Sequence, residues 1–256
     1  MSSFLLATLA TLAMLTGTFI GIYLHVRLPD DHLTDETKDI VKLATGILAT
    51  IAGLVLSLLI TTAKSSYDAV ADDVKGAAAD FILTDRTLAQ MGPEAAKMRQ
   101  LLRQTLEIAK NADLTKAMNV GARVDPLSQA ATYVDEIGRL VRDMPLAKPS
   151  DEWLRQRTLT LLTDLSRVRW MLQQEATNVL PGPFVAIVVI WLGIIFAGFG
   201  LFAPLNPTAI GALVLGAISI SASLFLIDEL NTPFHGIVHI STSPFVEAAR
   251  IMGPLR

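Results

Sequence analysis

Four uncharged apolar runs constrain the fold of this chain more than any other feature of its sequence. They cover residues 4–24, 43–63, 184–203 and 208–227, and none contains Asp, Glu, Lys or Arg. Each is close to the roughly 20 residues that an α-helix needs to cross the hydrocarbon core of a bilayer. A mean hydropathy of +0.48 and a content of 52% hydrophobic residues favour the same class. The sequence therefore predicts a multi-pass protein whose first partner is the lipid bilayer.

The first run is expected to remain as a span rather than to be cleaved as a signal peptide. Residues 1–3 carry no basic side chain, and the run ends in YLHVRLPDD instead of a small-x-small cleavage site. Its length also exceeds the roughly 7 to 15 apolar residues of a signal peptide.

An even number of crossings places both termini and the long central segment on one side of the membrane. Basic residues close to the span ends mark the cytoplasmic side. Such residues follow the second span, precede the third and occur in the tail: Lys64, Arg167, Arg169, Arg250 and Arg256. We therefore expect the termini and the central segment to be cytoplasmic, and the acidic loop at 25–42 to lie outside.

The central segment predicts a helical bundle. No proline occurs from Asp39 to Met91, so a single helix of roughly 50 residues, about 75 Å long, could leave the membrane and continue. Three further helices are expected: one after Gly92-Pro93, one from Pro126 to about Met144, and one from Ser150, its N-cap, to about Leu180.

The predicted fold class is therefore all-α, with two membrane hairpins on either side of a cytosolic bundle. The expected domains are an N-terminal hairpin at 1–63, a bundle at 64–183, a C-terminal hairpin at 184–228 and a tail at 229–256. In the tail, Phe245, Ala248, Ala249 and Met252 share one side of a short helix. That side suits either the membrane interface or docking on the bundle.

Small residues line one face of two predicted spans. In the second span they are Gly46, Ala49, Gly53 and Ser57, and in the fourth Ala212, Gly216, Ser219 and Ser223. Such faces allow helices to approach closely, as does Gly17-x-x-x-Gly21 in the first span. The alternative for the two longer stripes is that they line a narrow conduit in an oligomer.

Three charged residues are predicted at the cytoplasmic ends of the second and fourth spans. Lys64 could pair with Asp228 and join the two spans, or each charge could reach separately into the headgroup layer. In an oligomer, a ring of Asp228 or Glu229 would select cations.

Several functional classes have no support in the sequence. The chain contains no cysteine, and Pro233 and Gly236 interrupt any helix that would present His235 and His239 together to a metal. No nucleophile elbow, phosphate-binding glycine loop or basic patch is present. We expect no enzyme, no metal site, no cofactor and no nucleic-acid partner.

Three stretches carry a family resemblance: GLVLSLLITTAKSSYDAVADDV at 53–74, LSRVRWMLQQEATNVLPGPFVAIVVIWLGIIFAGFGLFAPLNP at 165–207, and LFLIDELNTPFHGIVHISTSPFVEA at 224–248. With them, nearly the whole chain resembles the bestrophin-like family of bacterial membrane proteins. The resemblance implies a homo-oligomer in the bacterial inner membrane. The family name points to bestrophins, which are pentameric anion channels, although no bestrophin neck or calcium-clasp motif can be transferred.

The leading functional hypothesis is an ion channel of bestrophin-like type, a passive conduit for an inorganic ion that is gated through the continuous second helix. Its predicted lining is Gly46, Gly53 and Ser57, with Asp228 and Glu229 at the inner mouth and Lys64 as an ion-pair partner. The alternative is a membrane-anchored scaffold or sensor whose cytosolic bundle binds a partner.

Overall fold

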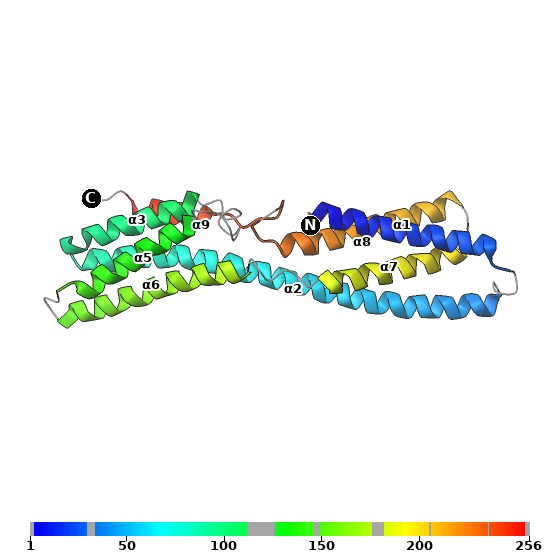
Figure 1. Cartoon of the computed structure of the whole chain (residues 1–256), viewed down its shortest axis with the longest axis horizontal. Coiled ribbons are helices and arrows are strands. Elements are labelled where there is room, and N and C mark those ends of the chain that lie inside the picture. Colours follow the sequence, from blue (N-terminus) through cyan, green and yellow to red (C-terminus); the bar gives the residue numbers. More distant parts are fainter. Residues whose placement is uncertain are drawn as a thin grey trace. The chain divides into compact units, whose positions relative to one another are not determined.

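The computed structural model describes residues 3–29, 34–111, 126–145, 149–175, 182–204, 206–234 and 236–253, and within these ranges it contains helices and turns but no strand. The helices are α1 (Ser3–Arg27), α2 (Asp35–Gln90), the short η2 (Pro93–Ala95), α3 (Ala96–Asn111), α5 (Pro126–Asp143), α6 (Pro149–Glu175), α7 (Gly182–Phe202), α8 (Pro207–Leu230) and α9 (Ser243–Met252) (Figure 1). The all-α prediction is confirmed.

Four of the described helices are long and apolar enough to cross a membrane: α1, α2, α7 and α8. They contain the four apolar runs of the sequence except Ala203, the last residue of the third, so the predicted spans are confirmed as helices. The described part of the helix predicted to end near Leu180 ends at Glu175, and residues 176–181 lie outside the described residues. The side chain of Ser150, the predicted N-cap, also lies outside them.

Helix α2 is the single long helix that the absence of proline predicted. It has 56 residues and ends at Gln90. Gly92, which follows, has a φ of 86°, a left-handed conformation that glycine adopts without steric cost. Pro93 then begins η2, where its missing N–H is not needed.

The chain forms two compact units, each with its own core. The first contains residues 1–67 and 179–238, and the second contains residues 68–178 and 239–256. The boundaries lie a few residues from those expected at 63/64 and 183/184. The segment expected as one tail, 229–256, is instead divided between the units after residue 238.

Glycines bring the helices of the first unit into close contact. Helix α1 packs against α7 and α8 (Figure 1). A Cβ at Gly17 or Gly21 would overlap a backbone carbonyl oxygen of α7, and one at Gly200 would overlap a carbonyl oxygen of α1. The packing role predicted for Gly17-x-x-x-Gly21 is confirmed. Between α1 and α8, Thr11 Oγ1 donates a hydrogen bond to Ser221 Oγ at 2.7 Å.

The second unit is a bundle with an apolar core and one buried ionic cluster. Asp85 on α2 is only 5% exposed and accepts hydrogen bonds from Arg99 Nε at 2.9 Å and Nη2 at 3.0 Å. Arg103 Nη2 lies 3.6 Å from Asp85 Oδ1. Because a buried carboxylate is costly unless it is paired, this cluster fixes α3 against α2.

Helix α9 docks on this bundle. Phe245, Ala248 and Met252 are buried, and the ring of Phe245 packs edge to face on Phe81 with centroids 6.1 Å apart. Arg103 Nη2 donates a hydrogen bond to the carbonyl oxygen of Met252 at 2.9 Å. Of the two alternatives for the tail, the structure shows docking, because the apolar side predicted for the membrane interface is already covered by protein.

Candidate functional site

The inner and outer faces of α2 differ in the first unit. Its inner face packs into the core through Ala52, Leu59 and Ala63. At about 100° of rotation per residue, Gly46, Gly53 and Ser57 lie roughly 100–140° around the helix from Ala52, to one side of that inner face. All three are exposed, and a Cβ added at either glycine would meet nothing within 4 Å.

These glycines therefore behave differently from those of α1 and α7. Gly17, Gly21 and Gly200 are small because a neighbouring backbone occupies the space beside them. Among the described residues, no atom lies within 4 Å of a Cβ added at Gly46 or Gly53. Within one copy, the described residues show no helix packed closely against these glycines. Ala49, from the same predicted stripe, is partly buried against the core.

Two threonines extend the stripe. Thr50 and Thr61 are exposed on the same side of α2, and their hydroxyl groups donate to the carbonyl oxygens of Gly46 and Ser57, each at 2.9 Å. With their protons committed to the helix, these hydroxyls offer acceptor lone pairs outward. Sequence reasoning missed both residues, although the spacing that selected Gly46, Gly53 and Ser57 also includes them. We call Gly46, Thr50, Gly53, Ser57 and Thr61 the α2 stripe.

Bulky apolar side chains border the α2 stripe. Leu43, Ile47, Leu54 and Leu58 are between 56% and 68% exposed. Leucine and isoleucine are well solvated by lipid, whereas glycine and hydroxyl residues gain little from it. We therefore expect lipid to cover the apolar border. Another protein surface or water is expected to cover the stripe.

The two adjacent acids at the end of α8 have different surroundings. Glu229 is only 3% exposed, and its Oε2 accepts hydrogen bonds from the backbone N–H groups of Ile237 at 2.6 Å and Val238 at 3.1 Å. Gly236, with a φ of 91°, lies against this carboxylate, and a Cβ there would overlap it. The side chain therefore holds the turn that follows α8.

Asp228 is half-buried, and its carboxylate has no hydrogen bond or ion pair within the described part of the chain. Its backbone carbonyl accepts a hydrogen bond from Thr232 Oγ1 at 3.1 Å. Of the two acids, Asp228 is the one whose charged group is not committed to the protein. Glu229 could form a ring at a mouth only by giving up its two backbone donors.

The ion pair suggested between Lys64 and Asp228 stays a prediction. Lys64 Nζ lies over the ring of Tyr67, 5.8 Å from its centroid. A cation is attracted to the face of an aromatic ring, and a partner three residues along the same helix is always within reach. Lys64 thus has an aromatic partner on its own helix.

The described residues contain no group of three His, Cys, Asp or Glu side chains that could hold a metal ion. His235, one of the two histidines considered in the sequence, lies outside the described residues.

The comparisons with known proteins bear on the family and the fold of the chain. Residues 12–245 match the family model of the Bestrophin-like domain. The fold is similar to the crystal structure of a mutant of a bacterial bestrophin homologue from Klebsiella pneumoniae, with a TM-score of 0.63, 13% sequence identity and coverage of 98% of both chains. No curated protein matches the chain by sequence.

Proposed function

The chain belongs to the Bestrophin-like domain family, whose model covers residues 12–245, and from this membership we propose that it is an oligomeric ion channel. Several copies would assemble in the bacterial inner membrane, around an axis lined by the α2 stripe. The two terminal hairpins would cross the membrane, and the second unit, with both termini, would be cytoplasmic.

The observation that carries the proposal is the unused outer face of α2. A membrane helix gains little from turning glycines and hydroxyls to lipid, yet the described residues leave open space beside Gly46 and Gly53. In an oligomer, Gly46 and Gly53 let neighbouring copies approach or leave room for an ion. The hydroxyls of Thr50, Ser57 and Thr61 then supply polar groups along its path.

The chemistry of the lining favours cations. Thr50 and Thr61 donate to their own helix, so they present oxygen lone pairs outward. At the predicted cytoplasmic mouth, the carboxylate of Asp228, which has no partner among the described residues, adds a negative charge, and acidic rings select cations. Bestrophins are known as anion channels, so the family resemblance does not support selectivity for cations. The residues of this chain do.

Flux into liposomes that contain the purified protein tests the proposal. We expect K⁺ to enter faster than into empty liposomes, and the reversal potential in a KCl gradient to show a preference for K⁺ over Cl⁻. Asp228→Asn should reduce that preference. Glu107→Gln, which removes a negative charge at an exposed position of α3, should leave it unchanged. Flux equal to that of empty liposomes across salts and pH would reject the channel.

That rejecting result would favour the membrane-anchored scaffold or sensor. In this alternative the spans only hold the second unit at the membrane, and the α2 stripe serves contacts between copies without a conduit. The purified protein would still be an oligomer but would conduct nothing.

A further inference from the structure

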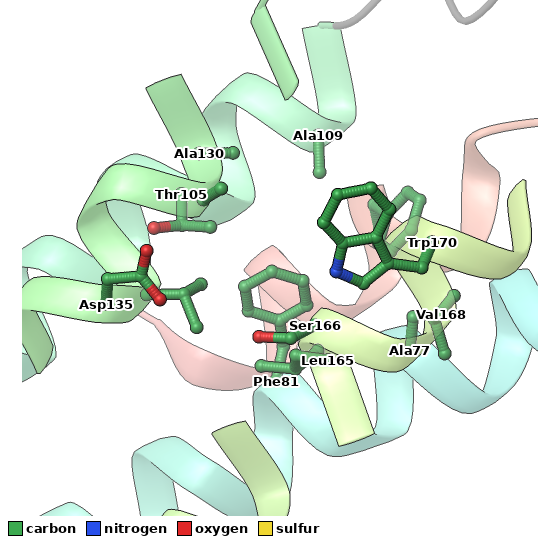
Figure 2. Close-up of a pocket in the computed structure, with 13 residues that line it drawn as sticks. Ala77, Phe81, Thr105, Ala109, Ala130, Asp135, Leu165, Ser166, Val168 and Trp170 are labelled. Atoms are coloured by element: carbon green, nitrogen blue, oxygen red, sulfur yellow. The ribbon is translucent and has the colours of Figure 1, made fainter. Parts of the chain in front are cut away.

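The second unit contains a half-open cavity of about 270 Å³ between α2, α3, α5, α6 and α9 (Figure 2). A concave, mostly apolar space with a few polar groups at its edge is typical of a small-molecule site. Ligand sites of helical bundles are commonly formed in this way, from side chains on facing helices.

Alanines keep the cavity open. Ala77, Ala109, Ala130 and Ala131 line it from three helices, where longer side chains would fill it. Elsewhere in the bundle large side chains are fully buried, among them Leu88, Leu102, Ile137 and Leu161. The space is therefore a local feature and not a sign of a loose core.

Aromatic rings form much of the remaining wall. Phe81 and Phe245 line the cavity together, packed edge to face. Trp170 lies across the space from Asp135 and Thr105, with its indole nitrogen turned inward (Figure 2). Such walls suit an apolar or aromatic body, and their faces also attract a cation.

The hydroxyl and carboxylate groups of the wall act as acceptors. The hydroxyls of Thr105 and Ser166 donate to the carbonyl oxygens of Leu101 at 2.9 Å and Leu162 at 3.0 Å, which leaves their lone pairs free to accept.

Asp135, which is exposed at the edge of the cavity, forms no hydrogen bond or ion pair with the described residues. The nearby cations are used by its neighbour Glu136, which pairs with Arg139 at 2.7 Å and Lys97 at 3.8 Å. The hydrogen bond from Arg139 lowers the pKa of Glu136, so that pair is charged at neutral pH.

We propose that this cavity is a binding site for a small amphipathic organic amine. Its apolar body lies between the aromatic rings and alanines, and its ammonium group donates to the carboxylate of Asp135. Since a cavity of about 150 Å³ holds benzene, this one accepts roughly ten non-hydrogen atoms. The site does not depend on the chain being a channel.

Titration calorimetry on the full chain in detergent tests the site with three probes of similar size. They are phenethylamine, which is cationic, 2-phenylethanol, which is neutral, and 3-phenylpropanoate, which is anionic. Because the ammonium group carries a charge opposite to that of Asp135 and the hydroxyl carries none, phenethylamine should bind up to about fivefold tighter than the alcohol. Propanoate should bind most weakly. Equal affinity for amine and alcohol, or no binding of any probe, would overturn the proposal.

Three substitutions locate the binding. Asp135→Asn should remove the advantage of the amine over the alcohol, and Asp143→Asn, on the same helix but outside the cavity lining, should preserve it. Ala109→Leu should fill the space and abolish binding of both probes. Ala131→Leu, from α5, is the second filling variant if the first fails to fold. Unchanged binding in a folded filling variant, or an equal effect of the two Asp substitutions, would show that the cavity is not the site.

Discussion

Glu229→Gln is the substitution that best separates a structural carboxylate from a pore carboxylate. The wild-type side chain is 3% exposed and accepts two backbone hydrogen bonds, from Ile237 and Val238. Glutamine keeps the size and one acceptor oxygen but loses the charge. Charge-assisted hydrogen bonds contribute about 1 kcal/mol more than neutral ones, so two of them predict a loss of about 2 kcal/mol.

The assay is thermal unfolding of the purified protein in detergent, followed by circular dichroism. A loss of about 2 kcal/mol corresponds to a fall of about 4–8 °C in the unfolding midpoint for a chain of this size. Asp228→Asn is the matched control, since its carboxylate makes no hydrogen bond within the described residues, and its midpoint should change by no more than about 2 °C. Gly236→Ala should destabilise the same turn, because its φ is 91° and the added Cβ would overlap the Glu229 carboxylate.

The reasoning would be refuted if Glu229→Gln left the midpoint unchanged and altered ion selectivity as Asp228→Asn is expected to do. That result would mean that the Glu229 carboxylate faces a conducting path and that its backbone donors contribute nothing.

Two further pairs of substitutions test the packing of each unit by the same thermal unfolding assay. Asp85→Ala removes the buried partner of Arg99 and should cost about 3–5 kcal/mol, whereas Asp72→Ala, on the same helix in an exposed pair, should cost less than about 1 kcal/mol. A similar loss in both would show that the buried pair has no special role. Gly200→Ala forces a Cβ into the backbone of α1 and should cost about 1–3 kcal/mol, but Gly76→Ala, beside open space on α2, should cost nothing and gain up to about 1 kcal/mol from helix propensity. If the Gly200 variant were the more stable of the two, the close contact between α1 and α7 would be wrong.

The spans could be predicted from the sequence because the thickness of the bilayer requires about 20 consecutive apolar residues, and few other structures need so long an apolar run. The single helix α2 could be predicted for an equally local reason, since only Gly92-Pro93 interrupts it. The packing role of Gly17 and Gly21 could also be predicted, because membrane helices approach closely where both carry small residues.

The environment of each charge could not be predicted in the same way. Asp228 and Glu229 are adjacent, so on a helix they point about 100° apart, and which one is buried depends on a turn that folds back eight residues later. Lys64 could contact the ring of Tyr67 on its own helix or an acid on another helix, and sequence spacing alone does not say which partner it contacts. The cavity requires side chains from five helices, and no local pattern marks it.

The most direct test of the channel is chemical modification of a single cysteine at Ser57. The chain has no cysteine of its own, so Ser57→Cys is the only thiol in the variant. Liposome flux is measured before and after a water-soluble, positively charged methanethiosulfonate reagent, with Leu215→Cys, whose native side chain is 67% exposed on α8, as the lipid-facing control. A lining position predicts modification and loss of K⁺ flux for Ser57→Cys and neither for Leu215→Cys. Unmodified Ser57→Cys, or full flux after its modification, would contradict a conduit lined by α2.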